Sequence, residues 1–294
     1  MTDALYGAIE AGGTKFRIAV GTSPDLIADT TIPTTTPDET IGASIEFLEH
    51  YAGQLKAVGI ASFGPLDLDP SSATYGSIIR TPKPGWTGTP FRELITDALG
   101  VPVAIDVDVG GAAIGEWTWG AARGLDTFIY MTVGTGVGGG IFAGGRIHHG
   151  MGHPELGHIA VAREPDDDFA GHCPFHGACF EGMAAGPAIS ARWGERVTDL
   201  VDRPEVWDLE ARYIAQALRT LTYVVAPQRI IVGGGVNRNE GLLGLVRDKL
   251  SDQLAGYGTN PVVDSDLTDY VVSPEFGQDA GLVGAIALAA GLDH

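Results

Sequence analysis

Apolar residues recur along this chain in short runs of strand length, and most runs end at glycine or proline. Residues 5–11 and 16–21 are two such runs, with Gly12 and Gly13 between them, which predicts a β-hairpin with a glycine turn. The remaining pattern predicts strands at 26–33, 56–62, 101–107, 228–233 and 270–273, and helices at 38–51, from 108, at 204–227, at 239–254 and from 277.

The glycine hairpin occurs twice. Residues 130–145 repeat the strand, glycine turn and strand of residues 7–21, and each copy is followed by helices and a further strand. The chain is therefore expected to be an α/β protein built twice from a βββαβα unit. Its 294 residues also exceed the usual span of one core. We expect two domains, 1–115 and 116–294, with a central cleft between two hairpins that can hold a triphosphate. The last helix can belong to either domain, because the chain can return to the first domain at its end.

The first glycine turn carries candidate chemistry. Gly12 and Gly13 lack Cβ atoms, so the backbone can adopt positive φ there and come close to a ligand. Thr14 and Lys15 add a hydroxyl and a cation at the tip. The alternative is an ordinary hairpin turn, because glycine turns are common between strands.

Two acidic residues stand at the end of the strand predicted at 101–107. Asp108 stands where a helix N-cap belongs, at the carboxyl end of a strand, which is where open α/β sheets bind ligands. It either caps the helix only or acts as a general base, kept ionised by the positive helix end. Asp106 is a rival base that would point the same way from the strand and sit deeper.

A compact group of Cys and His predicts a metal site. Cys173, His176 and Cys179 are spaced three apart twice, so a tight turn can aim all three side chains at one point. Zinc prefers four tetrahedral N or S ligands. Since the chain has only two cysteines, two histidines must complete the set, and His158 is the preferred fourth ligand.

Other arrangements of this group stay open. His172 ranks below His158 because neighbouring residues such as His172 and Cys173 rarely reach one metal without strain, and His153 ranks next. A disulfide is a second possibility, although secreted disulfide frameworks carry more cysteines in shorter chains. Two plain buried thiols are the third, which would leave the intervening His176 as a coincidence.

Several loops hold residues that often line sites. Gly64 and Pro65 break the strand pattern after residue 62, and a Pro- and Gly-rich loop carries Lys83 and Trp86. Surface turns are the alternative for both. The glycine turn at 233–235 would let a flat ring or a phosphate lie against the backbone.

The charge balance excludes several partners. The net charge of −19 opposes non-specific attraction to nucleic acid and to anionic membranes. A phosphate ligand must therefore be held locally, by backbone amides, a helix N-terminus or a divalent cation. The start of the chain does not resemble a signal peptide, so we expect a cytoplasmic protein. The apolar segment 280–292 is short and rich in Gly and Ala, which suits a packed helix.

Taken together, these motifs resemble the ROK family of sugar kinases, and most closely its bacterial fructokinases. The motifs run in order over most of the chain: IEAGGTK, the FGPLD loop, TPKPGW, Asp108 opening a helix, GTGVGGGI, HPELGH, CPFHGACFEG and IIVGGGV. The resemblance implies an actin-like (ribonuclease H-like) fold that transfers the γ-phosphate of ATP to a hexose hydroxyl, for fructose the 6-hydroxyl.

The resemblance also implies roles for individual residues. Asp108 matches the catalytic base, and Glu155 matches the glutamate that contacts the sugar, on a substrate side that includes Gly64, Pro65 and His158. The residues that match the ATP-binding segments are Glu10, Gly12, Gly13, Thr14, Lys15, Thr135, Gly136, Gly138, Pro187, Gly233 and Gly234.

The same resemblance implies two metal ions, Zn²⁺ and Mg²⁺, and a homodimer. His158, Cys173, His176 and Cys179 match the zinc ligands, so a structural Zn²⁺ would order the sugar-binding loop 153–181. The reacting metal should be Mg²⁺, held mainly by the phosphate oxygens of ATP. We expect the sugar and phosphates on the first domain, the adenosine on the second, and a homodimer.

Two positions depart from the family pattern. Gly110 stands where many members have Asn, which puts one sugar hydrogen bond in doubt, and Glu10 stands where many have Asp. Other functions therefore stay in view: a kinase for glucose, mannose or an N-acyl hexosamine, and a non-catalytic zinc-stabilised sugar-binding protein. A transcription regulator of the same family is disfavoured, because only five residues precede Tyr6 and leave no room for a basic helix-turn-helix domain.

Overall fold

The computed structural model describes residues 4–22, 24–257 and 266–293, and the chain divides into two compact units. The first unit consists of Met1–Gly124, Ile147–His153 and Glu275–His294, and the second of Leu125–Arg146 and Pro154–Pro274. The chain thus enters the first unit three times. The domain boundary predicted at residues 115 and 116, and the binding roles of the two domains, stay predictions.

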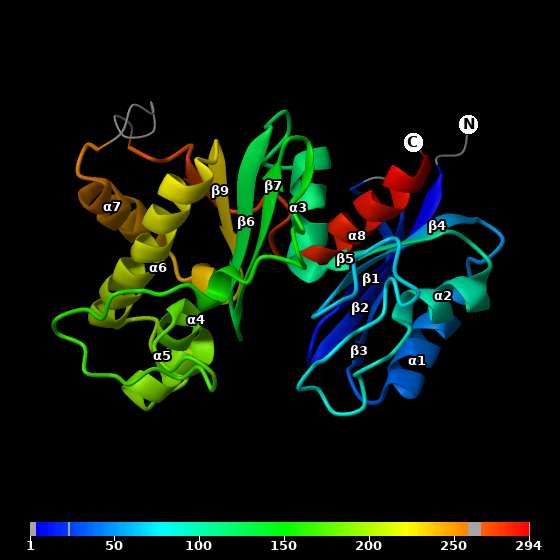
Figure 1. Ribbon diagram of the computed structural model, residues 1–294, viewed down its shortest axis with the longest axis horizontal. Coiled ribbons are helices and arrows are strands. Elements are labelled where there is room, and N and C mark those ends of the chain that lie inside the picture. The colour runs from blue at the N-terminus through cyan, green and yellow to red at the C-terminus, as the bar shows by residue number, and fades with distance from the viewer. Residues whose placement is uncertain (1–3, 23, 258–265, 294) are drawn as a thin grey trace. The chain divides into compact units, whose positions relative to one another are not determined.

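The first unit contains a five-stranded sheet in the order β3-β2-β1-β4-β5 (Figure 1). The first three strands pair antiparallel, and β4 and β5 continue from β1 in parallel. The strands are β1 (Leu5–Ala11), β2 (Lys15–Gly21), β3 (Leu26–Pro33), β4 (Leu55–Ser62) and β5 (Val103–Val107), and the helices are α1 (Pro37–Glu49), α2 (Phe91–Leu99), α3 (Asp108–Thr118) and α8 (Ala280–Ala290). The predicted hairpin, the strands that follow it and the helices α1, α3 and α8 are confirmed, whereas α2 was not predicted.

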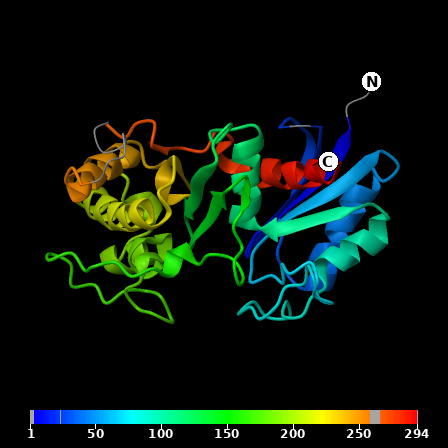
Figure 2. The same cartoon turned by 45° about the horizontal axis from the view of Figure 1, so that its top comes forward.

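One face of this sheet is lined by very small residues, which lets a helix approach closely. Its buried alanines are Ala8, Ala19, Ala57 and Ala61. A Cβ atom at Gly59 would overlap the backbone of Ala285 in α8, so this helix lies directly on β4 and β1. It also crosses α3 at close range, where a Cβ at Gly115 would lie 2.9 Å from the Cα of Gly284. Figures 1 and 2 show α8, in red, beside α3 in both views.

The opposite face carries large side chains. Phe16 packs against Trp86 and Phe91 with ring centroids 5.4 and 5.7 Å apart, and all three rings are fully buried. Trp86 donates its indole N–H to the carbonyl of Thr35 at 2.9 Å. Trp86, which the loop composition offered as a candidate for lining a site, is therefore a core residue, because it fills the space beneath α2.

The second unit repeats the arrangement of the first. Its sheet has the order β10-β9-β6-β7-β8, with β6 antiparallel to β7 and parallel to β9. The strands are β6 (Thr127–Val133), β7 (Val137–Ala143), β8 (Arg146–Ile147), β9 (Arg229–Gly233) and β10 (Val271–Val272), and the helices are α4 (Phe180–Ala184), α5 (Gly186–Trp193), α6 (Pro204–Val225) and α7 (Leu242–Leu254). Each strand takes the place of its counterpart in β1 to β5, which confirms the predicted duplication.

The closing apolar segment forms a packed helix, as predicted. All residues of α8 except Leu288 and Ala290 are buried. In the parts of the chain that the structure describes, no helix combines the length and the apolar character needed to cross a membrane.

Candidate functional site

The carboxyl ends of the parallel strands β1, β4 and β5 meet at one edge of the first unit's sheet. Three acidic residues lie there. Glu10 comes one residue before the end of β1, Asp106 one residue before the end of β5, and Asp108 at the first position of α3. This is the edge at which open α/β sheets bind ligands.

Asp108 lies inside the helix and does not cap it, which corrects the predicted N-cap. The N-cap residue is Val107, in an extended conformation with φ −64° and ψ 154°. The chain turns into the helix one residue earlier than expected, so the Asp108 carboxylate accepts the N–H of Val109 at 2.8 Å. The side chain is partly exposed at the positive end of α3, where a negative charge is stabilised.

Asp106 is deeper than Asp108, as its strand position predicted. It is 4% exposed, and its Oδ1 accepts the N–H of Val107 at 2.7 Å. Its Oδ2 lies 2.9 Å from Nε2 of His149. Both carboxylate oxygens of Asp106 therefore have partners within the first unit, which makes it a poorer candidate for a base than Asp108.

Glu10 faces Arg17 across the β1–β2 pair, with Nη1 of Arg17 3.5 Å from Oε2 of Glu10. Arg17 also donates to the carboxylate of Asp279 at 2.6 Å. Burial raises the pKa of Glu10 to about 7, and the nearby negative charge of Asp108 adds to the rise while Arg17 opposes it. Near neutral pH, Glu10 is therefore ionised in only part of the molecules.

The first glycine turn is built differently from the prediction. Neither Gly12 nor Gly13 has positive φ. Gly12 is required by space instead, because a Cβ there would lie 2.8 Å from the carbonyl oxygen of Lys15. Lys83 donates to the carbonyl of Gly13, so the loop that carries it is tied to the hairpin tip. Gly13, Thr14 and Lys15 are exposed at this tip.

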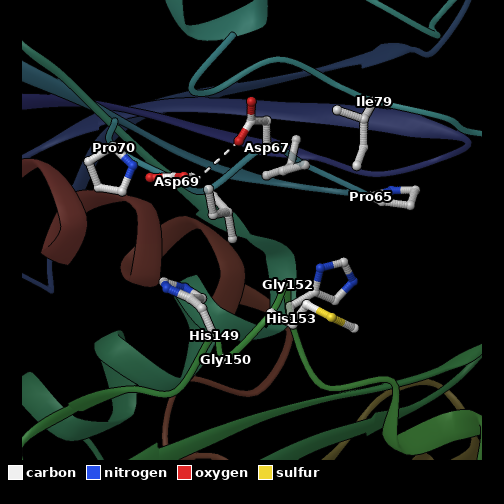
Figure 3. Close-up of a pocket in the computed structure, with 12 residues that line it drawn as sticks. Pro65, Asp67, Asp69, Pro70, Ile79, His149, Gly150, Gly152 and His153 are labelled. Carbon is white, nitrogen blue, oxygen red and sulfur yellow. Dashed lines mark hydrogen bonds between the residues drawn. The ribbon is translucent and has the colours of Figure 1, made fainter. Parts of the chain in front are cut away.

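A cavity of about 860 Å³ opens in the first unit between the loop after β4 and the segment Ile147–His153 (Figure 3). Its lining includes Pro65, Asp67, Asp69, Ile79, His149 and His153. Gly64 packs against the ring of His153, where a Cβ would lie 3.1 Å from Cε1. The structure thus places the predicted residue Pro65 in the lining of this cavity and Gly64 against the lining residue His153. It adds His149, which the sequence patterns did not indicate.

In the second unit, three predicted nucleotide-binding segments come together. The N–H of Gly186 donates to the carbonyl of Gly134 at 2.7 Å, which places Pro187 at the start of α5 beside the turn of Thr135 and Gly136. Gly234 has φ 95°, and a Cβ there would overlap the backbone of Val133 at the end of β6. Glycine turns from β6, β9 and α5 therefore lie side by side, with Gly138 in β7 next to them.

Glu181 at the start of α4 also belongs to this group, although the sequence patterns did not indicate it. Its Oε2 accepts the N–H of Val137 at 2.9 Å. A Cβ at Gly136 would lie 2.9 Å from the same oxygen, so the glycine makes room for the carboxylate. The contact spans 44 residues of sequence and fixes the conformation of the β6–β7 turn.

The four predicted metal ligands converge in the second unit. The candidate ligand atoms of His158, Cys173, His176 and Cys179 all lie within 4.8 Å of one another. Nδ1 of His158 is 3.5 Å from Sγ of Cys179 and 3.8 Å from Sγ of Cys173. Both cysteines are free thiols, so the alternative of a disulfide is wrong. The alternative ligand His153 belongs to the first unit.

The geometry of this cluster fits a tetrahedral zinc ion. Zinc bonds of about 2.0–2.3 Å place neighbouring ligand atoms roughly 3.3–3.8 Å apart, which matches the separations of His158 from both sulfur atoms. A reciprocal pair of backbone hydrogen bonds between Cys173 and Gly177 closes the turn that holds two of the ligands. Burial raises the pKa of the Cys179 thiol, so a bound cation is what would stabilise its thiolate.

Comparison with known proteins agrees with this architecture. A family model described as the ROK family matches residues 6–291. The chain belongs to the ROK family.

Relatives of this ROK protein match nearly its whole length. The fructokinase of Zymomonas mobilis is 43% identical over 97% of the chain and 96% of that protein, and the fructokinase of Streptococcus mutans is 42% identical over 97% of each. Among solved structures, a ROK hexokinase from Thermus thermophilus matches with a TM-score of 0.78 and 26% identity over 98% of this chain and 99% of that one. A ROK family glucokinase from Streptomyces griseus, in complex with glucose and AMPPNP, matches with a TM-score of 0.76, 26% identity and the same coverage. These matches confirm the predicted actin-like fold.

Proposed function

We propose that this ROK protein is an ATP-dependent sugar kinase that phosphorylates the 6-hydroxyl of fructose, with Asp108 as general base. The relatives named fructokinase support fructose as the acceptor. The observation that carries the mechanism is the position of Asp108, partly exposed at the start of α3 and at the carboxyl edge of the sheet.

In the proposed reaction, the Asp108 carboxylate takes the proton of the acceptor hydroxyl as its oxygen bonds to the γ-phosphorus of ATP. The bond between that phosphorus and the β–γ bridging oxygen breaks, and ADP leaves with the electron pair. Phosphoryl transfer needs positioning and charge stabilisation more than an unusual base, so an ordinary carboxylate suffices.

The glycine turns would hold the nucleotide. Gly12 to Lys15 at the first hairpin, and Thr135, Gly136 and Gly138 at the second, offer backbone N–H groups to the phosphates. Gly233, Gly234 and Pro187 would lie beside the adenosine. Mg²⁺, bound by the phosphate oxygens with Glu10 as a candidate carboxylate, would neutralise charge that develops on the phosphates.

The Cys and His cluster would hold a structural Zn²⁺. A site closed by four protein ligands leaves no position for a substrate. Its four ligands lie in the segment that also carries Glu155, the proposed sugar contact, and the N–H of His158 donates to the carbonyl of Glu155 at 3.0 Å. Zinc would therefore order the loop from which Glu155 reaches the sugar.

A coupled assay of ADP release across a hexose panel tests the proposal. Fructose should give the highest kcat/KM, and ³¹P NMR of the product should show phosphate on the 6-position. A preference for glucose would favour the second candidate, which a relative named glucokinase from Streptomyces coelicolor supports at 30% identity. Sugar binding without ADP release would leave a non-catalytic sugar-binding protein. The expected homodimer can be checked by sedimentation.

A further inference from the structure

Three residues of the first unit form a contact that the proposed mechanism does not use. Oδ2 of the buried Asp106 lies 2.9 Å from Nε2 of His149, on the segment Ile147–His153. Gly110, in the first turn of α3, lies beneath the same carboxylate: a Cβ there would overlap Oδ1 of Asp106 and lie 2.9 Å from its Cγ. The Asp106 carboxylate therefore occupies space that any side chain at position 110 would need.

We propose that His149 is a further acceptor-binding residue, that Asp106 is the positioning residue that orients it, and that Gly110 is what makes this pair possible. The inference rests on the proposed function for the identity of the acceptor, a hexose. The Asp106–His149 pair itself rests on the geometry of the first unit alone.

The orientation of the imidazole follows from its partner. An ionised carboxylate only accepts hydrogen bonds, so the proton between the two residues belongs to Nε2 of His149. This leaves Nδ1 as the ring nitrogen that can still bind a ligand. The His149 side chain is 34% exposed and lines the cavity of about 860 Å³. Its Nδ1 can accept a hydrogen bond from a sugar hydroxyl when the ring is neutral, or donate one to a sugar oxygen when the ring is charged.

The cavity wall opposite His149 suits a polyol. Figure 3 shows His149 and His153 on the segment that faces Asp67 and Asp69 across the cavity. Asp67 and Asp69 supply the polar groups of this wall, among apolar residues such as Leu66 and Leu68. Asp67 accepts hydrogen bonds from hydroxyl groups of the neighbouring loop, including that of Thr74 at 2.6 Å, which holds its carboxylate in place. A hexose between the two walls would meet hydrogen-bonding groups on both sides.

The Asp106–His149 pair and a side chain at position 110 exclude each other, because the Asp106 carboxylate fills the space that the side chain would need. The Asp106 carboxylate could leave only by giving up two hydrogen bonds, the one to the N–H of Val107 at 2.7 Å and the one to His149. Position 110, where glycine offers no side chain to a sugar, is thus coupled to a different polar group. His149 would supply from the cavity wall a contact that position 110 cannot make.

Steady-state kinetics test the binding role. We expect His149→Ala to raise the KM for the preferred hexose about tenfold, the cost of one hydrogen bond, with the KM for ATP changed less than about twofold. The matched control is His148→Ala, since His148 is the exposed neighbour on the same segment. A hexose KM within twofold of the wild type in His149→Ala, or an equal rise in His148→Ala, would overturn the assignment.

The role of Gly110 is tested by a double-mutant cycle. Gly110→Ala should raise the hexose KM as His149→Ala does, and the two together should cost no more than either alone, because both remove the same contact. Gly42→Ala is the control for a helix glycine, as its Cβ would meet nothing within 4 Å. Additive effects would show that Gly110 acts separately from His149 and would overturn the coupling.

An NMR titration tests the pair without turnover. The hydrogen bond to Asp106 raises the pKa of His149 and partial burial opposes this rise. The signal of His149 is identified as the imidazole signal that is absent from the spectrum of His149→Ala. This signal should titrate at lower pH in Asp106→Asn and in Gly110→Ala than in the wild type. An unchanged midpoint in both variants would overturn the pair. Adding fructose alone should shift this signal in the wild type. If no hexose were phosphorylated, the proposed function would fail. The titration midpoints would still test the Asp106–His149 pair, and the shift on adding fructose would still test the binding role of His149.

Discussion

The carboxyl group of Glu10 packs directly against Gly281 in the first turn of α8, where a Cβ atom would lie 2.8 Å from Cγ of Glu10 and overlap its carboxylate. The contact joins the end of β1 to a helix that is 271 residues away in sequence. It buries an acidic group under backbone, and this burial is the main reason why the pKa of Glu10 rises to about 7. The stability of the protein must therefore depend on pH through this one residue.

The sign of that dependence follows from the raised pKa. In the unfolded chain Glu10 ionises near its ordinary pKa of 4.5, whereas in the folded protein it keeps its proton up to about pH 7. The favourable contribution of Glu10 is thus complete below pH 4.5 and is lost as the pH rises to 7. The loss amounts to at most about 3 kcal/mol, and less because the side chain is 27% exposed.

We therefore expect Glu10→Gln, which keeps the shape and removes the charge, to raise the free energy of unfolding at pH 8 and to leave it unchanged at pH 4. Denaturant unfolding at both values measures this difference. Glu49→Gln, on the exposed end of α1, is the control and should behave like the wild type at both. Equal stability of Glu10→Gln and wild type at pH 8 would contradict the burial of a charge at this contact.

Replacing the proposed base should remove catalysis and leave the fold intact. Asp108 is partly exposed, and its carboxylate accepts one backbone N–H that the amide oxygen of Asn can also accept. We expect Asp108→Asn to fold normally, to bind ATP, and to lose at least ~10²-fold in turnover, the low end for a positioned base. The ADP-release assay and calorimetric ATP titration measure the two effects. Asp97→Asn, exposed on α2, is the control, and near-normal turnover of Asp108→Asn would refute the role.

The second glycine turn should depend on Glu181. Its carboxylate accepts a hydrogen bond from the N–H of Val137, so removing the carboxylate leaves the β6–β7 turn free to adopt other conformations. A hydrogen bond to a charged group contributes about 1.5–3 kcal/mol, so Glu181→Ala should weaken ATP binding at least about tenfold with little change in hexose KM. Glu181→Gln keeps an acceptor oxygen and should lose less. Equal ATP affinity in the wild type and Glu181→Ala would show that the β6–β7 turn keeps its conformation without Glu181, and would contradict the prediction.

The duplicated fold was predictable because its signals are local. Each hairpin is marked by apolar runs on both sides of a glycine turn, and the strand order of both sheets follows from repeating one βββαβα unit. The meeting of Cys173, His176 and Cys179 was predictable for a similar reason, since a short turn brings such closely spaced side chains together. The count of two cysteines required a second histidine, and His158 was preferred to His172 and His153 without being the only choice.

The contacts that the sequence did not indicate join distant segments. His149 meets Asp106 across 43 residues, and Glu181 meets Val137 across 44. Periodicity describes neighbours a few residues apart and carries no signal for such pairs. The exact start of α3 was also missed, because a cap depends on backbone angles at Val107 that a neighbouring acidic residue does not determine.

Zinc should contribute directly to folding at the cluster of His158, Cys173, His176 and Cys179. Cys173 is 7% exposed, and its backbone forms the turn with Gly177, so loss of the metal would loosen this whole segment. We expect Cys173→Ala to lower both the bound zinc per chain and the Tm, because the binding energy of a structural metal is part of the folding energy. Elemental analysis and thermal unfolding, with and without a chelator, measure these changes. His172→Ala is the matched control, since His172 is adjacent to Cys173 but lies outside the cluster. A wild type that purifies without zinc, and whose Tm does not respond to added Zn²⁺, would contradict the prediction.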